Sequence, residues 1–222
     1  MLNQSKGNMY GWVTHTWNTI KGECSHDCVY CYMKRFGQQR AIRFDEKELK
    51  TDLGTGNRIF VGSSCDMFAA DVPGEWISKT LEHCRQYDSE YLLQTKNPER
   101  FIQYIEDIPE RHILCTTIEC DRQHNGISSA PAPYERAGAM SQLSYLGFKT
   151  SVTIEPIMDF DHDELIAMVA MARPAWVSIG ANTAHWCKLP EPTPEKVRSL
   201  IQALSQFTDV IEKDNLKRLL KG

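Results

Sequence analysis

The chain has 222 residues, 41% of them hydrophobic and 24% charged, and its formal net charge is −4 at pH 7. This length favours a single domain over residues 1–222, with a lead-in at 1–10 and a helical tail at 208–222. No apolar run approaches the ~20 residues that span a bilayer, and residues 1–8 lack an apolar signal core, so we expect a cytoplasmic protein without a membrane partner.

Six β-rich runs alternate with helical segments along the chain. The strands are expected at 12–17, 58–61, 91–95, 113–118, 150–155 and 176–179. Helices are expected at 45–53, 75–87, 134–146 and 161–171, with one that starts at Pro98 behind an Asn97 cap, one that starts at Thr193 and a short basic one at 214–220. Proline suits the first helical position because its missing N–H has no intrahelical partner there.

This alternation of strands and helices implies parallel pairing through right-handed crossovers. An eight-unit barrel takes about 250 residues, so six units need roughly 190 and fit this chain. The pattern therefore predicts an α/β fold, an open partial (β/α)6 TIM-like barrel of parallel strands. A doubly wound sheet is the alternative, because composition alone does not separate the two.

Nearly every predicted strand has one polar face, because successive side chains of a strand point to opposite sides. In 150–155, the polar set alternates with Val152 and Ile154. The polar sets of four strands are Leu92, Gln94 and Lys96; Cys115, Thr117 and Glu119; Ser151, Thr153 and Glu155; and Ser178, Gly180 and Asn182. In a parallel barrel the apolar faces meet the helices, so we expect the polar faces to line the interior and their last members to line the mouth.

The segment Cys24-Ser25-His26-Asp27-Cys28-Val29-Tyr30-Cys31 follows the first strand and carries three cysteines. Thiolates at this spacing can surround one face of a metal cluster, and three of them leave one coordination position open. A disulfide framework is disfavoured, because no secretory signal precedes the loop and the cysteines crowd together in it. A structural zinc site needs a fourth ligand, which His26 supplies only with difficulty.

The pattern Cys24-x3-Cys28-x2-Cys31, with Tyr30 before the last cysteine, resembles the signature of the radical S-adenosylmethionine (radical SAM) superfamily. The resemblance implies an open six-unit barrel, a [4Fe-4S] cluster held by these three cysteines, and SAM bound to the fourth iron. In that family an electron from the reduced cluster splits SAM into methionine and a 5′-deoxyadenosyl radical, which abstracts hydrogen from a substrate. The wider context is similar to a phage-associated branch without an assigned substrate, through Thr16-Trp17-Asn18-Thr19, Cys31-Tyr32, Val61-Gly62-Ser63 and Thr95-Lys96-Asn97-Pro98.

The resemblance also suggests residues that contact SAM. Glu119, just past its strand, is a candidate acceptor for the ribose hydroxyls, and we group Tyr30 and Thr117 with it as cofactor-binding residues. The turn Gly62-Ser63-Ser64 resembles the place where the family binds the methionyl amino group. Because this turn lacks the familiar glycine-glycine-glutamate, backbone carbonyls or Asp66 would have to bind that group. The alternative for each is a polar residue satisfied inside the barrel or by water.

The candidate catalytic residues are Cys65, Glu155 and Lys96. Lys96 is a candidate partner for a carboxylate of SAM or of the substrate, whereas Glu155 and Asn182 are candidates for the ribose, the adenine or the substrate. Cys65, like Cys120 and Cys187, follows a strand end and is therefore expected near the mouth, where it is a candidate donor of a hydrogen atom to a substrate radical. Free, partly buried thiols are the alternative.

These observations predict a radical SAM enzyme that acts on a small-molecule or nucleotide-like substrate. The substrate class includes a nucleotide, a nucleobase and a modified DNA or RNA base, with deazaguanine-type synthesis and photoproduct-lyase-like repair as alternative reactions. A flavodoxin- or ferredoxin-type reductant must supply the electron, because no second redox centre is evident. The rival from another class is a non-catalytic binding module that carries zinc or an Fe–S cluster.

The charge pattern leaves nucleic acid open as a partner without favouring it. A net charge of −4 argues against non-specific coating of nucleic acid, which needs many cations. Lys34, Arg35, Arg40 and Arg43 nevertheless cluster directly after the cysteine loop. Such a run is either a solvated face or a contact for substrate phosphates.

Overall fold

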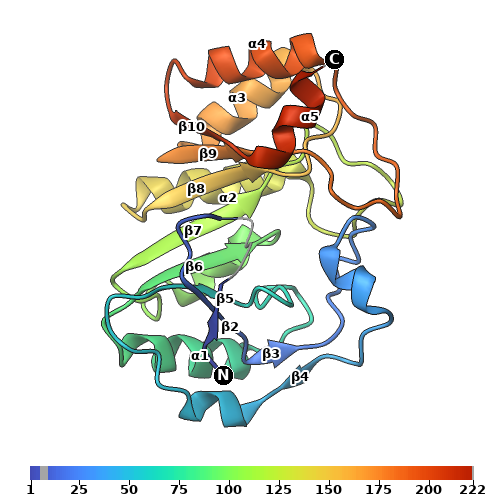
Figure 1. Ribbon diagram of the computed structural model, residues 1–222. Coiled ribbons are helices and arrows are strands. Elements are labelled where there is room, and N and C mark those ends of the chain that lie inside the picture. The colour runs from blue at the N-terminus through green and yellow to red at the C-terminus, as the bar shows by residue number, and fades with distance from the viewer. Residues whose placement is uncertain (6–9, 222) are drawn as a thin grey trace.

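The computed structural model describes residues 1–5 and 10–221, and within them one eight-stranded sheet forms the centre of the molecule (Figure 1). In spatial order its strands are β1 (Asn3–Gln4), β2 (His15–Trp17), β5 (Arg58–Val61), β6 (Glu90–Thr95), β7 (His112–Thr117), β8 (Thr150–Ile154), β9 (Trp176–Ile179) and β10 (Asp209–Glu212). Neighbours from β2 to β10 run parallel, and β1 is antiparallel to β2. Since β1 and β10 are the two edges of this order, the sheet is open, and the expected α/β partial barrel is confirmed.

The helices of the described chain follow the strands. They are α1 (Gly74–Arg85), α2 (Pro133–Tyr145), α3 (His162–Ala172), α4 (Pro194–Leu204) and α5 (Lys217–Leu220), with 3-10 turns η1 (Tyr32–Phe36), η2 (Glu46–Lys50), η3 (Pro98–Tyr104) and η4 (Asp214–Leu216). The side chain of Asp161 accepts hydrogen bonds at the start of α3, and that of Thr193 does so at the start of α4. None of these helices has both the length and the apolar character that crossing a bilayer demands.

Two of the predicted α-helices are only 3-10 turns. The segment expected at 45–53 is confined to η2, and the segment that starts at Pro98 is η3. The predicted cap at Asn97 is wrong: its side-chain amide donates to the carbonyl of Phe68, 3.0 Å away, and does not cap η3. Since a tertiary contact takes the capping group, this turn lacks the side-chain cap that favours a regular helix start.

The two faces of the sheet carry different side chains, but the inner face is not lined by polar side chains alone, contrary to what the alternation predicted, because it also holds an apolar cluster. Val152, Ile154, Val177 and Ile179 belong to a large core that also contains residues of all four longer helices. The opposite face has a smaller apolar cluster, which includes Phe60, Leu92, Ile113 and Cys115 together with Tyr10 and Val13 from before β2. The helices therefore cover the outer face, and the segment 10–13 covers part of the inner face.

The sequence pattern did not predict β10 or the ribbon of β3 (Ile20–Lys21) and β4 (Arg43–Phe44). β10 pairs with β9 within the stretch expected to be a helical tail, and helix follows only from η4 onward. The antiparallel ribbon joins the two ends of the segment 22–42, which carries the three cysteines and η1. Figure 1 shows this segment in blue, standing away from the sheet and facing the loop between β9 and α4.

Candidate active site

Successive turns arrange the three cysteines of the loop. The carbonyls of Cys24, Cys28 and Cys31 each accept a hydrogen bond from the backbone N–H three residues further on, at 3.0 Å in every case. Asp27 has a φ of +42°, in the left-handed region that Asp tolerates better than most residues. Cys28 is buried, and Cys24 and Cys31 are half-buried. The backbone thus folds the spacing of the motif into a short coil with all three thiols on one loop.

His26 and Asp66 fix this loop to the ends of β5 and β6. Asp66 Oδ2 lies 2.9 Å from His26 Nε2, and it also accepts from Thr95 Oγ1 at 2.9 Å and from the N–H of Lys96 at 2.8 Å. Burial alone would lower the pKa of His26, but the hydrogen bond and charge of Asp66 raise it. Asp66, a sequence candidate for the amino group of SAM, therefore has protein partners and holds the loop.

Loops after β7 and β9 hold the same segment from two further sides. The N–H of Val29 donates to the carbonyl of Ile127 at 2.9 Å, and the N–H of Ser129 donates to the carbonyl of His26 at 2.7 Å. The Trp186 indole N–H donates to the carbonyl of Val29, also at 2.9 Å. The cysteine loop thus lies over the carboxyl ends of the parallel strands, and the loops that follow these strands hold it there by hydrogen bonds.

Glu119, at the end of β7, is the centre of a buried polar network. Its two oxygens accept hydrogen bonds from Tyr30, Lys96 and Arg136, and the Arg136 contact measures 2.7 Å. The Glu119 and Arg136 side chains are only 3% and 4% exposed, so they are shielded from water. Burial raises the pKa of Glu119, but the charges of Lys96 and Arg136 outweigh it and hold that pKa well below its usual range. Tyr30 joins this network to the cysteine loop.

The turn Gly62-Ser63-Ser64 after β5 also touches the cysteine segment. The hydroxyl of Tyr32 donates to the carbonyl of Ser63 at 2.7 Å, and the N–H of Ser64 donates to Asn18 Oδ1 at 2.9 Å. Gly62 has a φ of +76°, which a residue with a Cβ adopts only with strain. Asn18, from the stretch that carried the branch resemblance, therefore shapes this turn.

Three other predicted residues, one in β7 and two beyond β8 and β9, have partners of their own. Glu155, beyond β8, pairs with Lys213 and Asn215 from the segment after β10. Thr117 accepts from the side chain of Gln94 at 3.2 Å, inside the barrel. Asn182 organises its own loop, because its side chain donates to the carbonyls of Ala184 and Cys187 and accepts from the N–H of Ala184.

Cys65 lies close to the cysteine loop, whereas the other cysteines do not join it. The Cys65 thiol donates to the carbonyl of Glu23, and the interaction of Cys65 with the neighbouring Cys24 lowers the pKa of Cys24. Cys120 bonds the carbonyl of Arg122 at 3.0 Å, and burial raises its pKa to about 11. Cys187 faces its own loop. Cys84 and Cys115 are buried, as expected.

These residues fit a cluster held by three thiolates. All three thiols come from one loop that is fixed on several sides. The neighbouring thiol of Cys65 lowers the pKa of Cys24, whereas burial raises the pKa of Cys31. Within residues 1–5 and 10–221 no three His, Cys, Asp or Glu side chains gather as a set for a single metal ion. Nε2 of His26 is hydrogen-bonded to Asp66, so only Nδ1 of this ring could serve as the fourth ligand of a zinc site in this loop.

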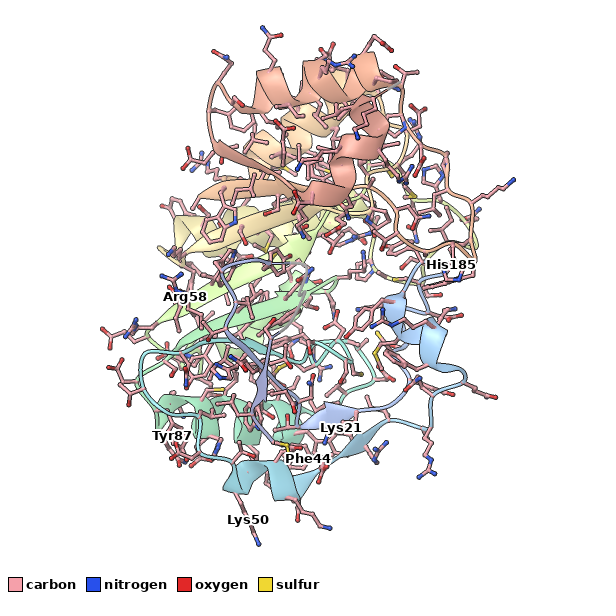
Figure 2. All side chains as sticks on the ribbon, in the orientation of Figure 1. Lys21, Phe44, Lys50, Arg58, Tyr87 and His185 are labelled. Carbon is pink, nitrogen blue, oxygen red and sulfur yellow. The ribbon has the colours of Figure 1, made fainter. Side chains whose placement is uncertain are left out.

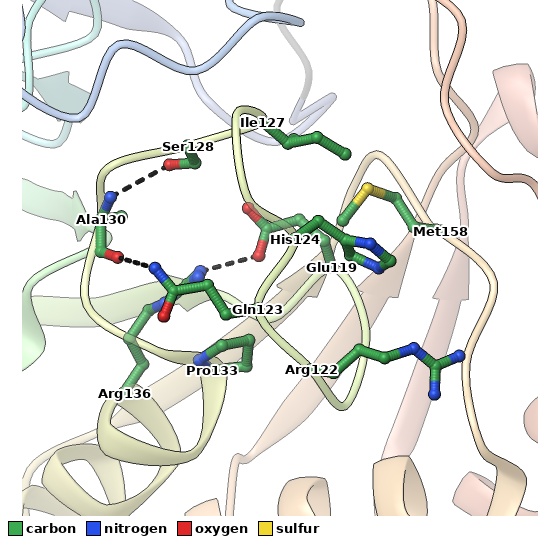
Figure 3. Close-up of a pocket in the computed structure, with 10 residues that line it drawn as sticks. All are labelled: Glu119, Arg122, Gln123, His124, Ile127, Ser128, Ala130, Pro133, Arg136 and Met158. Carbon is green, nitrogen blue, oxygen red and sulfur yellow. Dashed lines mark hydrogen bonds and ion pairs between the residues drawn. The ribbon is translucent and has the colours of Figure 1, made fainter.

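A small cavity lies between Glu119 and the loop that follows β7 (Figure 3). Its volume of about 20 Å³ has room for about one water molecule. Figure 3 shows the Arg136–Glu119 ion pair on one side and the ring of His124 on another. The loop is thus packed down onto the buried network. A second, larger cleft of about 880 Å³ is lined by the loop after β9 and by α5.

Arg136, His26 and Lys213 are the main site residues that the sequence analysis did not select. Arg136 lies on the buried stripe of α2, with Met140 and Leu143. An arginine at the same helical spacing as apolar residues indicates a buried cation. Such a cation needs a carboxylate or a similar partner nearby, so the sequence did contain a signal for Arg136. His26 was considered only as a metal ligand, and Lys213 belongs to a segment whose strand was missed.

Comparisons with known proteins give a family and a fold. Residues 8–179 match the model of a family described as protein of unknown function (DUF5131). No curated protein matches the sequence. A cysteine-to-alanine mutant of spore photoproduct lyase superposes with a TM-score of 0.69 at 13% identity, covering 96% of this chain and 78% of that one.

Two further structures of the lyase give the same result. A cysteine-to-serine mutant has a TM-score of 0.66 at 13% identity, covering 94% of this chain and 79% of that one. A mutant with bound AdoMet and dinucleoside spore photoproduct has a TM-score of 0.61 at 14% identity, and it covers 91% of this chain but only 64% of that one. At such low identity these likenesses establish a shared fold.

Proposed function

Since this chain belongs to the DUF5131 family and shares its fold with a lyase that binds AdoMet, we propose that it is a radical SAM enzyme. The observation that carries the proposal is the anchored loop of Cys24, Cys28 and Cys31 above the carboxyl ends of the parallel strands. That edge is where barrels of this kind place their chemistry. Residues 1–222 would act as one catalytic domain.

In this proposal the three cysteine thiolates hold a [4Fe-4S] cluster and leave one iron for SAM. A reduced cluster bound there would supply the electron for the reductive cleavage of SAM. Tyr30 and Glu119 keep the loop at a fixed height above the sheet, because the hydroxyl of Tyr30 donates to the buried carboxylate. A flavodoxin- or ferredoxin-type protein is the proposed electron donor, and the cytoplasm the proposed location.

The polar residues at the mouth would bind and orient SAM. Lys96 and Arg136 together carry one more charge than Glu119, and this surplus supports the role of Lys96 as partner of a carboxylate. A carboxylate has about four lone-pair sites, so Glu119 retains acceptor capacity for a ribose hydroxyl beside its three protein donors. Carbonyls of the turn Gly62-Ser63-Ser64 would receive the amino group. Thr117, Glu155 and Asn182 are kept as more distant candidates for SAM or the substrate.

A nucleotide-like substrate is the best supported class. One structure of the lyase with this fold contains a dinucleoside spore photoproduct, which supports a substrate built from nucleosides. A photoproduct-lyase-like reaction is therefore preferred over deazaguanine-type synthesis, and membership of the phage-associated branch is part of the proposal. Cys65 lies beside Cys24, and in this proposal its thiol would return a hydrogen atom to the substrate radical.

Anaerobic reconstitution with iron and sulfide, reduction with dithionite and an assay for 5′-deoxyadenosine test this function. We expect the wild-type chain to bind iron and release 5′-deoxyadenosine. Cys28→Ala should lose both properties, whereas Cys84→Ala, which removes a thiol buried in α1, should keep both. An iron-loaded wild-type protein that releases none would contradict the proposal. A colourless protein that binds zinc would favour the binding-module rival.

A further inference from the structure

The larger cleft lies at the carboxyl ends of β9 and β10, between the loop 182–191 and α5. Four cations line it, and of these Arg218 is paired with Glu191 and Lys217 with Asp214. Lys188 and Lys221 are exposed and form no ion pair with the described residues. The cleft therefore carries a surplus of two positive charges in a protein whose net charge is −4.

The loop that forms one wall of this cleft also contacts the cysteine loop. His185 lines the cleft, and its ring packs edge-on against Trp186 at a centroid distance of 4.9 Å. Trp186 in turn donates its indole N–H to the carbonyl of Val29, inside the motif. Figure 2 places His185 beside the segment that carries the cysteines. A chain-like ligand in the cleft would thus lie next to a loop that contacts the cysteine segment.

Exposed aromatic and basic side chains also lie in η1, which follows the last cysteine directly in the chain. In η1, Phe36 and Tyr32 are 61% and 44% exposed, which is unusual for large rings. The guanidinium of Arg35 lies 4.6 Å from the centroid of Phe36 and 5.6 Å from that of Tyr32. Rings that flank a cation are surfaces on which unpaired bases stack, whereas a duplex hides its bases.

We propose that the cleft lined by Lys188 and Lys221 binds the phosphodiester backbone of a single-stranded nucleic acid, whose bases reach the aromatic residues of η1. The proposal rests on the proposed function, and it narrows the substrate from a nucleotide-like molecule to a polynucleotide strand. Each bound phosphate displaces counterions, so the affinity falls as salt rises. DNA and RNA share this chemistry.

Fluorescence anisotropy with 5′-labelled 12-nucleotide oligothymidylate, and in parallel with oligouridylate, tests the proposal on the reconstituted full chain. We expect binding at low salt and a loss of roughly tenfold or more in Lys188→Glu/Lys221→Glu. The plot of log affinity against log salt has a negative slope, and the magnitude of this slope should decrease by about 1.4 in the double variant. This corresponds to about 0.7 for each lost phosphate contact. Phe36→Ala should weaken binding by about tenfold without changing this slope.

The matched control is Lys47→Glu/Lys50→Glu, which makes the same change of net charge on η2. Both lysines are exposed, and Figure 2 shows Lys50 at the opposite end of the molecule from the cleft. Equal losses in the two double variants would overturn the proposal, as would competition by polyglutamate as strong as that by oligothymidylate. No binding by a wild-type chain that still cleaves SAM overturns only this inference, whereas binding without SAM cleavage overturns only the enzyme proposal.

Discussion

Glu119 and the groups around it concentrate three charges in a part of the molecule that water scarcely reaches. Lys96 comes from the end of β6 and Arg136 from α2, so one carboxylate connects two elements and, through Tyr30, the cysteine loop. Buried ions of this kind are tolerated only when every partner is present. This residue is therefore the point at which the stability of the sheet and the position of the loop depend on each other.

Glu119→Gln should destabilise the protein by about 3–5 kcal/mol, because it leaves two buried cations without a counter-charge. The exposed Glu82→Gln on α1 is the control and should change the free energy of unfolding by less than about 0.5 kcal/mol. Urea denaturation at pH 7 measures both values. Similar small changes in the two variants would show that the network contributes little.

The same residue predicts a pH dependence. The pKa of Glu119 is lower in the folded protein than the value of about 4.3 of an unfolded chain. Its contribution to stability is therefore complete above about pH 4.3 and is lost as the pH falls from there toward the folded pKa. The difference in unfolding free energy between wild type and Glu119→Gln should shrink as the pH falls below about 4.3. A difference that stays constant down to pH 3 would contradict the assigned cause.

At the scale of elements, the turns at the carboxyl ends of the strands determine where the cysteine segment lies. β5 ends in Gly62-Ser63-Ser64, which Tyr32 contacts, and β7 leads into the loop that contacts Val29 and His26. These contacts come from backbone groups as much as from side chains, so they depend on the conformation of each turn. Gly62 is the position where that conformation requires a particular residue.

Gly62→Ala should cost about 1–2 kcal/mol, because φ is +76° and an added Cβ would lie 3.2 Å from the carbonyl oxygen of Cys65. Gly138, inside α2, is the matched control, since nothing lies within 4 Å of an added Cβ there. Gly138→Ala should stabilise by about 0.5–1 kcal/mol. Thermal unfolding of both variants is the measurement, and a shift of the same sign in both would refute the strain argument.

The regular part of the fold follows from the sequence for a clear reason. Val152 and Ile154 alternate with Ser151 and Thr153. In a sheet that helices cover on one face, the apolar pair must point toward the helices and the polar pair away from them. β10 was missed because Asp209–Glu212 is only four residues long and places its two apolar residues side by side, without the alternation of a half-buried strand. Without β10, the pairing of Lys213 with Glu155 had no basis in sequence.

The site was predictable to a lesser extent. The spacing of Cys24, Cys28 and Cys31 is a local signal, so the loop proposed to hold the cluster could be selected from the sequence. The contacts of Asp66 with His26 join residues 40 positions apart, and no periodicity encodes them. Tertiary pairing of this kind is what single-sequence patterns lack.

At the scale of the whole molecule, an open barrel leaves part of its inner face to be covered by other segments. Tyr10 covers the face between β5 and β7: it is 4% exposed, its hydroxyl donates to Gln94 at 2.9 Å, and the ammonium of Lys213 lies 4.1 Å from its ring centroid. The segment before β2 and the segment after β10 thus meet inside the half-barrel. The contact between Tyr10 and Lys213 thus connects segments from the two ends of the sheet, although no strands pair there.

Tyr10→Ala should cost about 3–5 kcal/mol, since it removes a buried aromatic side chain and leaves a cavity. Tyr10→Phe keeps the ring and should lose only about 1 kcal/mol with the hydrogen bond to Gln94. Tyr145→Ala, at an 82% exposed position on α2, is the control. If urea denaturation showed equal costs for Tyr10→Ala and Tyr145→Ala, the inner face would not need this cover.

The central claim is that three cysteines hold a cluster and leave one iron for SAM. Electron paramagnetic resonance of the dithionite-reduced, reconstituted protein, recorded with and without SAM, tests it most directly. The account predicts a [4Fe-4S] signal whose g-values shift when SAM is added. A cluster signal that SAM leaves unchanged, at concentrations that saturate binding, would contradict it.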